Sequence, residues 1–166
     1  MKVKDFIGTQ GSTDIVAAIK EAELNTSGEI RVHIESKCKG DDPVNRAVSI
    51  FNHLKMYNTK DRNGVLIYVA VNSKKFAIIG DKGINEAVEA NFWDDIKQQM
   101  RECFVEGEYV KGLVLAIKQA KGFMSVPYAS IPAWAHSTIV VPLPSKGSNT
   151  LWPRCTPNTF AIACTI

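Results

Sequence analysis

Apolar side chains recur at helical spacing in four stretches of the chain. Ahead of the first, Ser12 or Thr13 is a good N-cap, and the helix is predicted to run to about Leu24. The second begins with Asp42 as N-cap and Pro43 as its first residue. Two more helices are predicted over residues 92–104 and 109–123. The stripes that we expect to be buried in the first two helices are Ile15, Val16, Ile19 and Ala22, then Val44, Ala47, Val48 and Phe51.

Three other stretches have the patterns of strands. Residues 29–35 (EIRVHIE) alternate strictly between polar and apolar, which predicts a strand with one buried face. Residues 64–71 (GVLIYVAV) are continuously apolar, as is typical of a central strand covered on both faces. The strand at residues 76–79 follows after so short a turn that the two must form an antiparallel hairpin.

The order of these elements predicts an α/β fold. A strand–helix–strand step is expected to be parallel and right-handed. We therefore predict a three-layer α/β/α sandwich around a central mixed sheet of about four strands.

The composition changes near Ser125. Residues 125–166 carry two basic residues, Lys146 and Arg154, no acidic residue, and all but one of the 7 prolines. Proline excludes long helices. We therefore predict an α/β/α domain over residues 1–124 and an irregular, proline-rich tail over 125–166, with a short strand at 137–141. The abrupt loss of acidic residues suggests that the tail is a frameshifted or foreign extension.

Length, charge and cysteine content limit the classes of function. The chain has 166 residues, enough for one sizeable core, and a net charge of +3, too weak to indicate nucleic-acid binding. Its 4 cysteines lie far apart, which argues against a zinc site or a disulfide framework. The polar start and the absence of a long apolar run argue against a signal peptide and a membrane span. We expect a cytoplasmic monomer that binds neither nucleic acid nor membranes.

The predicted topology brings three polar loops to one end of the sheet. They are residues 25–29, 59–64 and 80–86, which flank the start of the first two strands and the end of the third. Their side chains supply the hard oxygen ligands that calcium and magnesium prefer. The candidate metal ligands are Glu29, Asp61, Asn63, Asp81, Asn85 and Glu86.

These residues also have a purely structural interpretation. The sequence Asp-Arg-Asn-Gly at residues 61–64 is an ordinary turn before a strand, and Asp81 can cap a bend. The basic side chains of Lys60, Arg62 and Lys82 can neutralise the acids without a metal ion. No nucleophile–base pair can be assembled, because there is no G-x-S-x-G motif and no histidine partner for a cysteine. We therefore predict no catalytic residues.

Four blocks of the sequence resemble the TPM domain family, most closely its small stand-alone bacterial members. The blocks are residues 26–34 (TSGEIRVHI), 63–70 (NGVLIYVA), 80–84 (GDKGI) and 104–113 (F-x-x-G-x-Y-x-x-G-L). The resemblance spans residues 5–124. It implies an α/β/α sandwich with a four-stranded sheet, and crossing loops around residues 61–64 and 80–86 that bind a divalent metal, typically calcium. A plant chloroplast member of the family is described as an acid phosphatase.

Three functions remain open at this point. The first is a calcium-binding, metal-responsive module that presents a surface to a protein partner, whose identity the sequence does not give. The second is a metal-assisted phosphohydrolase, in which the ion polarises a phosphoryl oxygen. The third is a structural domain that needs no metal. Because no nucleophile can be matched, we favour a role that is not enzymatic.

Overall fold

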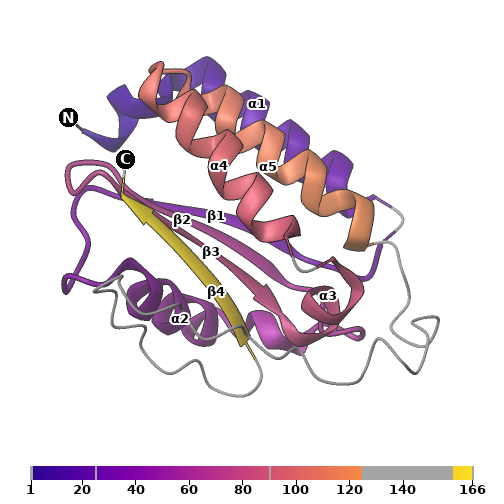
Figure 1. Cartoon of the computed structure of the whole chain (residues 1–166). Helices are drawn as coiled ribbons and strands as arrows, with labels where there is room; N and C mark the ends of the chain where they lie inside the picture. The colour runs from indigo at the N-terminus through magenta and orange to yellow at the C-terminus, as the bar shows by residue number, and fades with distance from the viewer. Residues whose placement is uncertain (1, 25, 90, 125–158, 166) are drawn as a thin grey trace.

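The computed structural model describes residues 2–24, 26–89, 91–124 and 159–165 (Figure 1). It confirms an α/β fold with a mixed sheet. The elements are α1 (Val3–Glu23), β1 (Ile30–Glu35), α2 (Pro43–His53), the 3₁₀ turn η1 (Met56–Asn58), β2 (Val65–Ala70), β3 (Lys75–Asp81), α3 (Lys82–Ala87), α4 (Phe92–Val105), α5 (Tyr109–Met124) and β4 (Thr159–Thr165).

The strands form one sheet in the order β1-β2-β3-β4. β1 is parallel to β2, and β2 forms an antiparallel hairpin with β3, so both predicted pairings are confirmed. β4 pairs antiparallel with β3 and comes from the segment predicted to be irregular. The strand predicted at residues 137–141 lies outside the described residues.

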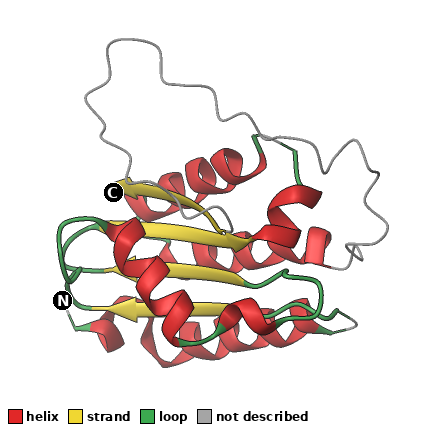
Figure 2. Ribbon diagram, turned by 90° about the horizontal axis from the view of Figure 1, so that it is seen from below, coloured by secondary structure: helices red, strands yellow, loops and turns green. Residues whose placement is uncertain are grey.

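Helices cover the sheet from two sides. α1, α4 and α5 lie over one face and α2 over the other, nearest the viewer in Figure 2. One hydrophobic cluster, which includes Ile67 and Trp93, packs under the three long helices. A second, which includes Phe51 and Leu66, packs under α2. Successive residues of β2 therefore alternate between two apolar cores, which explains why the whole strand is apolar.

The first helix is longer than predicted. α1 begins at Val3 and is interrupted at Gly8, where φ is 64° and ψ is 176°. The segment before Gly8 is anchored by Phe6, which is 6% exposed and whose ring centroid lies 4.2 Å from that of Tyr109. This contact joins residues far apart in the sequence, so the local pattern could not indicate it. The prediction that Val16 is buried is wrong, because its side chain is 47% exposed.

The other helix predictions agree closely with the structure. The predicted cap of α2 is confirmed, because Asp42 Oδ1 accepts from the Val44 N–H at 2.8 Å and Pro43 opens the helix. α4 and α5 match their predicted ranges within one residue. The short helix α3 lies where a polar loop was expected over residues 80–86. It forms after Asp81, whose carboxylate caps it by accepting from the Lys82 N–H.

Gly83 lies where α3 touches the loop before β2, and a side chain there would separate the two. A Cβ built on Gly83 would lie 1.9 Å from the Asp61 carbonyl oxygen and 2.9 Å from that of Arg62. We expect Gly83→Ala to lower the free energy of unfolding by about 2–3 kcal/mol, measured by urea denaturation.

Gly122→Ala in α5 is the matched control, because nothing lies within 4 Å of the place that a Cβ would take there. It should leave stability unchanged or raise it by up to about 1 kcal/mol, since alanine favours helix. Equal effects of the two substitutions would contradict the close approach at Gly83.

Candidate functional site

Three loops meet at one end of the sheet, as the topology predicted. We call residues 26–29, 59–64 and 80–86 the three-loop corner; Asn25 lies outside the described residues. Ser27 Oγ donates a hydrogen bond to the Asp61 carboxylate, which joins the first loop to the second. The Gly83 N–H donates to the Arg62 carbonyl oxygen at 2.7 Å, which joins the third loop to the second.

Asp61 and Asn63 share Ser27 as a partner. Asn63 Nδ2 donates to Ser27 Oγ at 3.2 Å and to the Met124 carbonyl oxygen, at the end of α5, at 3.1 Å. Asn63 is 3% exposed, and its Oδ1 accepts no hydrogen bond from the described residues. A buried acceptor without a donor costs about 1–3 kcal/mol. The corner therefore contains an oxygen that a hydrogen-bond donor or a cation would satisfy.

Asp81 is held by a different contact. Its side chain is fully buried and accepts from Arg62 through both oxygens, at 2.7 and 2.9 Å. The hydrogen bond from Arg62 to Asp81 raises the pKa of the guanidinium. One Asp81 oxygen also accepts from the Lys82 N–H at 2.9 Å. Arg62 therefore neutralises Asp81 without a metal ion, as the structural interpretation of these residues expected.

The other three candidate ligands have separate partners. Glu29 accepts from Arg31. Asn85 Oδ1 accepts from Trp93 Nε1 at 3.2 Å, and Glu86 lies 3.8 Å from the Lys82 ammonium. Over the described part of the chain, no group of three or more His, Cys, Asp and Glu side chains is arranged to hold a metal. The Ser27 cluster, which comprises Ser27, Asp61 and Asn63, thus offers one carboxylate together with neutral oxygens.

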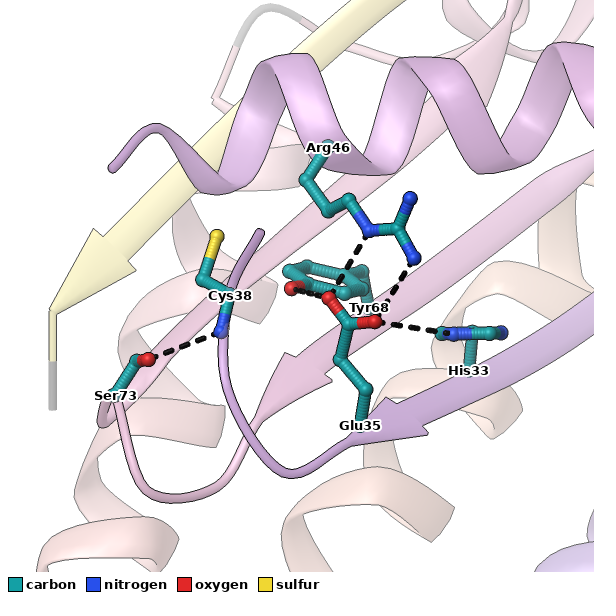
Figure 3. A network of polar contacts seen from close by, with 6 residues as sticks. All are labelled: His33, Glu35, Cys38, Arg46, Tyr68 and Ser73. Atoms are coloured by element: carbon teal, nitrogen blue, oxygen red, sulfur yellow. Dashed lines mark hydrogen bonds and ion pairs between the residues drawn. The ribbon is translucent and has the colours of Figure 1, made fainter. Parts of the chain in front are cut away.

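A second polar cluster lies at the opposite end of β1 (Figure 3). Glu35 accepts from Arg46 Nε at 3.0 Å and Nη2 at 2.9 Å, and also from the Tyr68 hydroxyl. His33 Nε2 lies 3.9 Å from a Glu35 oxygen. These contacts fasten α2, which carries Arg46, to the first two strands. The strand alternation left Glu35 on a polar face, and nothing in the sequence indicated its partner.

The charges of this second cluster are fixed at neutral pH. Arg46 first, and then Tyr68, hold the pKa of Glu35 at about 2, below the ordinary 4.5. Burial raises the pKa of Tyr68 and lowers that of His33. Glu35 is therefore ionised, Tyr68 protonated and His33 neutral. The cluster is a closed ion pair and not an acid–base pair poised near neutral pH.

Comparison with known proteins identifies the family. The family model for the TPM domain matches residues 2–123. The chain belongs to the TPM domain family. This TPM domain is similar to the BA42 protein of the psychrophilic bacterium Bizionia argentinensis, solved by NMR, with 46% identity and a TM-score of 0.68 over 76% of this chain and 88% of that chain.

A more distant structure agrees in fold alone. The N-terminal domain of the cg2496 protein from Corynebacterium glutamicum has 14% identity and a TM-score of 0.59, over 75% of this chain and 78% of its own. No match is found among curated proteins. In the described part of this TPM domain, no helix is both long and apolar enough to cross a membrane.

Removing the Glu35 charge should destabilise this TPM domain in a pH-dependent way. We expect Glu35→Gln to lower the free energy of unfolding by about 1–3 kcal/mol at pH 7, because Arg46 loses its carboxylate. The folded-state pKa of Glu35 is about 2 against 4.5. Its contribution is therefore complete above about pH 4.5 and is lost as the pH falls toward 2. Urea denaturation between pH 7 and pH 3 measures the difference.

The exposed Glu106 gives the control, since Glu106→Gln should change stability by less than about 0.5 kcal/mol at either pH. A Glu35→Gln difference that stays constant from pH 7 to pH 3 would contradict the ion pair.

Asp81→Asn should destabilise the fold more than any other change of one carboxylate at the corner. We expect a loss of about 2–3 kcal/mol by thermal or urea unfolding, below the 3–5 kcal/mol of fully buried pairs, because the Arg62 side chain is 40% exposed and can be solvated. Asp94→Asn removes the exposed pair with Lys97 and should cost less than about 1 kcal/mol. Similar losses for the two variants would exclude a structural role for Asp81.

Proposed function

We propose that the three-loop corner binds a divalent cation, with calcium preferred, and that the loaded corner presents a surface to a protein partner. The observation that carries the proposal is the buried Asn63 Oδ1, which lacks a donor among the described residues. The amide nitrogen of the same side chain donates to the Ser27 hydroxyl, which in turn donates to the Asp61 carboxylate. In the three-layer α/β/α arrangement that we infer, this corner lies at the end of the sheet, and its third loop adds Ile84 to the core under the long helices.

The donor chemistry favours calcium. The polar side-chain atoms of the Ser27 cluster are oxygens, apart from the Asn63 amide nitrogen. Calcium accepts about six to eight oxygen ligands in flexible geometry. Magnesium requires a stricter octahedron and keeps more of its water. Ligands carried by loops suit calcium better than magnesium, because calcium tolerates a less regular coordination geometry. Asp61 and Asn63 would hold the ion, and it would supply the positive charge that Asn63 Oδ1 lacks.

The charge count predicts weak binding. Asp61 brings one negative charge, while the Asp81 charge is neutralised by Arg62. Calcium affinity falls as the number of charged ligands decreases, so we expect a dissociation constant of about 10⁻⁴–10⁻³ M. Such a value suits a compartment richer in calcium than the cytoplasm. Its measurement therefore also bears on the expected cytoplasmic location, which stays a prediction, as does the monomeric state.

Asp81 has a positioning role in this proposal. Its carboxylate fixes α3 against the second loop through Arg62, which keeps the loops close together. The ligand roles of Glu29, Asn85 and Glu86 stay predictions. We favour binding over phosphohydrolysis, because Asp81 and Arg62 are engaged with each other in a closed ion pair.

Asp61→Asn should weaken calcium binding at least tenfold, or about 1.4 kcal/mol, because it removes the charged ligand while keeping an oxygen toward Ser27. Isothermal calorimetry on chelator-treated protein measures the affinity, and at equal calcium concentration the melting temperature should rise more in the parent chain than in Asp61→Asn.

Two controls make this result specific. Asp94→Asn should bind as the parent does, because Asp94 lies in the exposed first turn of α4 and pairs with Lys97. Asp81→Asn should reduce the free energy of unfolding by more than it reduces the free energy of calcium binding, because Asp81 positions the loops and is not a ligand in this proposal. Flat heats in the parent chain, or equal affinity of the parent and Asp61→Asn, would overturn the proposal.

A further inference from the structure

The outer edge of β3 is closed by a strand from outside the family-matched residues. β4 pairs with β3 residue by residue, from Lys75 opposite Thr165 to Asp81 opposite Thr159. The family model ends at residue 123, and β1 and β2 both lie on the other side of β3. Figure 1 shows β4 along the open side of β3, with α2 below and α4 above. The matched part of the domain therefore leaves this edge for another strand to fill.

The edge itself is chemically suited to strand addition. Between Lys75 and Asp81, β3 carries no charged residue and no proline. Phe76, Ala77 and Ile79 are fully buried. Natural edge strands that stay single are protected by charges, prolines or bulges, because an open apolar edge pairs with other chains. β3 has none of these protections along its centre.

We propose that the outer edge of β3 is a docking site for an extended, apolar segment of a partner protein, and that residues 159–165 of this chain are its displaceable occupant. Strand addition of this kind takes its affinity from main-chain hydrogen bonds and its specificity from alternate side chains. Residues 125–158 separate α5 from β4 in the sequence. A connection of that length can extend on the order of 100 Å, so β4 can leave the edge while remaining attached.

The register defines the ligand. The ligand is a segment that runs antiparallel to β3, is about as long as β3, and has no proline or charged residue at its centre. Phe160 stands opposite Gly80, which favours an aromatic residue at that position. Thr165 stands opposite Lys75, so an acidic residue there would add a favourable cross-strand pair. The proposal does not depend on metal binding, because neither the register nor the edge involves the Ser27 cluster.

The test weakens β4 in the full chain and offers the same strand in trans. The variant carries Ala161→Pro and Ile162→Pro together. Adjacent N–H groups of a strand point to opposite sides, so one of the two lost donors faces β3. The probe is a fluorescent peptide with the sequence of residues 159–165 and Cys164→Ser. We expect the variant to bind this peptide at least tenfold more tightly than the parent by fluorescence anisotropy.

Two further probes give the specificity. The same peptide with proline at the two central positions should not bind. A peptide with Thr165→Glu should bind the parent edge more tightly than the edge of Lys75→Ala. A folded double-proline variant, judged by far-ultraviolet circular dichroism, that binds the peptide no better than the parent would overturn the proposal.

Hydrogen exchange on the unaltered chain decides the matter if the double-proline variant does not fold. The amides of residues 159–165 should exchange at least tenfold faster than those of β2, and excess peptide should speed their exchange further. Exchange of residues 159–165 as slow as that of β2, unaffected by the peptide, would make β4 a permanent strand and overturn the proposal.

Discussion

The ion pair between Arg62 and Asp81 is the contact on which the three-loop corner depends. Arg62 has a φ of 52°, in the left-handed region that residues other than glycine rarely adopt. Its carbonyl oxygen accepts from the N–H groups of Gly83 and Ile84, at 2.7 and 3.3 Å, while its guanidinium pairs with Asp81. One strained residue thus fixes α3 through both its main chain and its side chain, and the close approach at Gly83 follows from this arrangement.

The two ends of the sheet use polar groups in opposite ways. At the far end, both Glu35 oxygens have donors, from Arg46 and Tyr68, and the cluster is complete without a ligand. At the corner, Asp81 is satisfied in the same manner, but Asn63 uses both N–H groups of its amide on Ser27 and Met124 and leaves its oxygen without a donor among the described residues. Because an unpaired buried acceptor is costly, the difference between the two ends points to the corner as the place for a ligand.

Local patterns were sufficient where an element depends on its own residues. The Asp42 cap and the apolar run of β2 were both predicted, and parallel pairing followed from the helix between the first two strands. The patterns failed where a distant contact decides. Phe6 is helical because it packs against Tyr109, and α3 forms because the Asp81 carboxylate caps it, although its glycine made the segment resemble a turn.

The candidate site shows the same division. Strand directions alone bring the three loops together, but side-chain conformation decides which base pairs with which acid, and Ser27 was missed because its role appears only through its hydrogen bonds.

Asp81 belongs to both the corner and the docking edge, and its contacts explain why the two can act separately. Its N–H donates to the Gly64 carbonyl oxygen at 2.9 Å, on the side of β2. Its carboxylate pairs with Arg62, and only its register with Thr159 involves β4. When β4 leaves, the contacts with Gly64 and Arg62 remain. These Asp81 contacts can therefore persist whether the outer edge of β3 is occupied by this chain or by a partner.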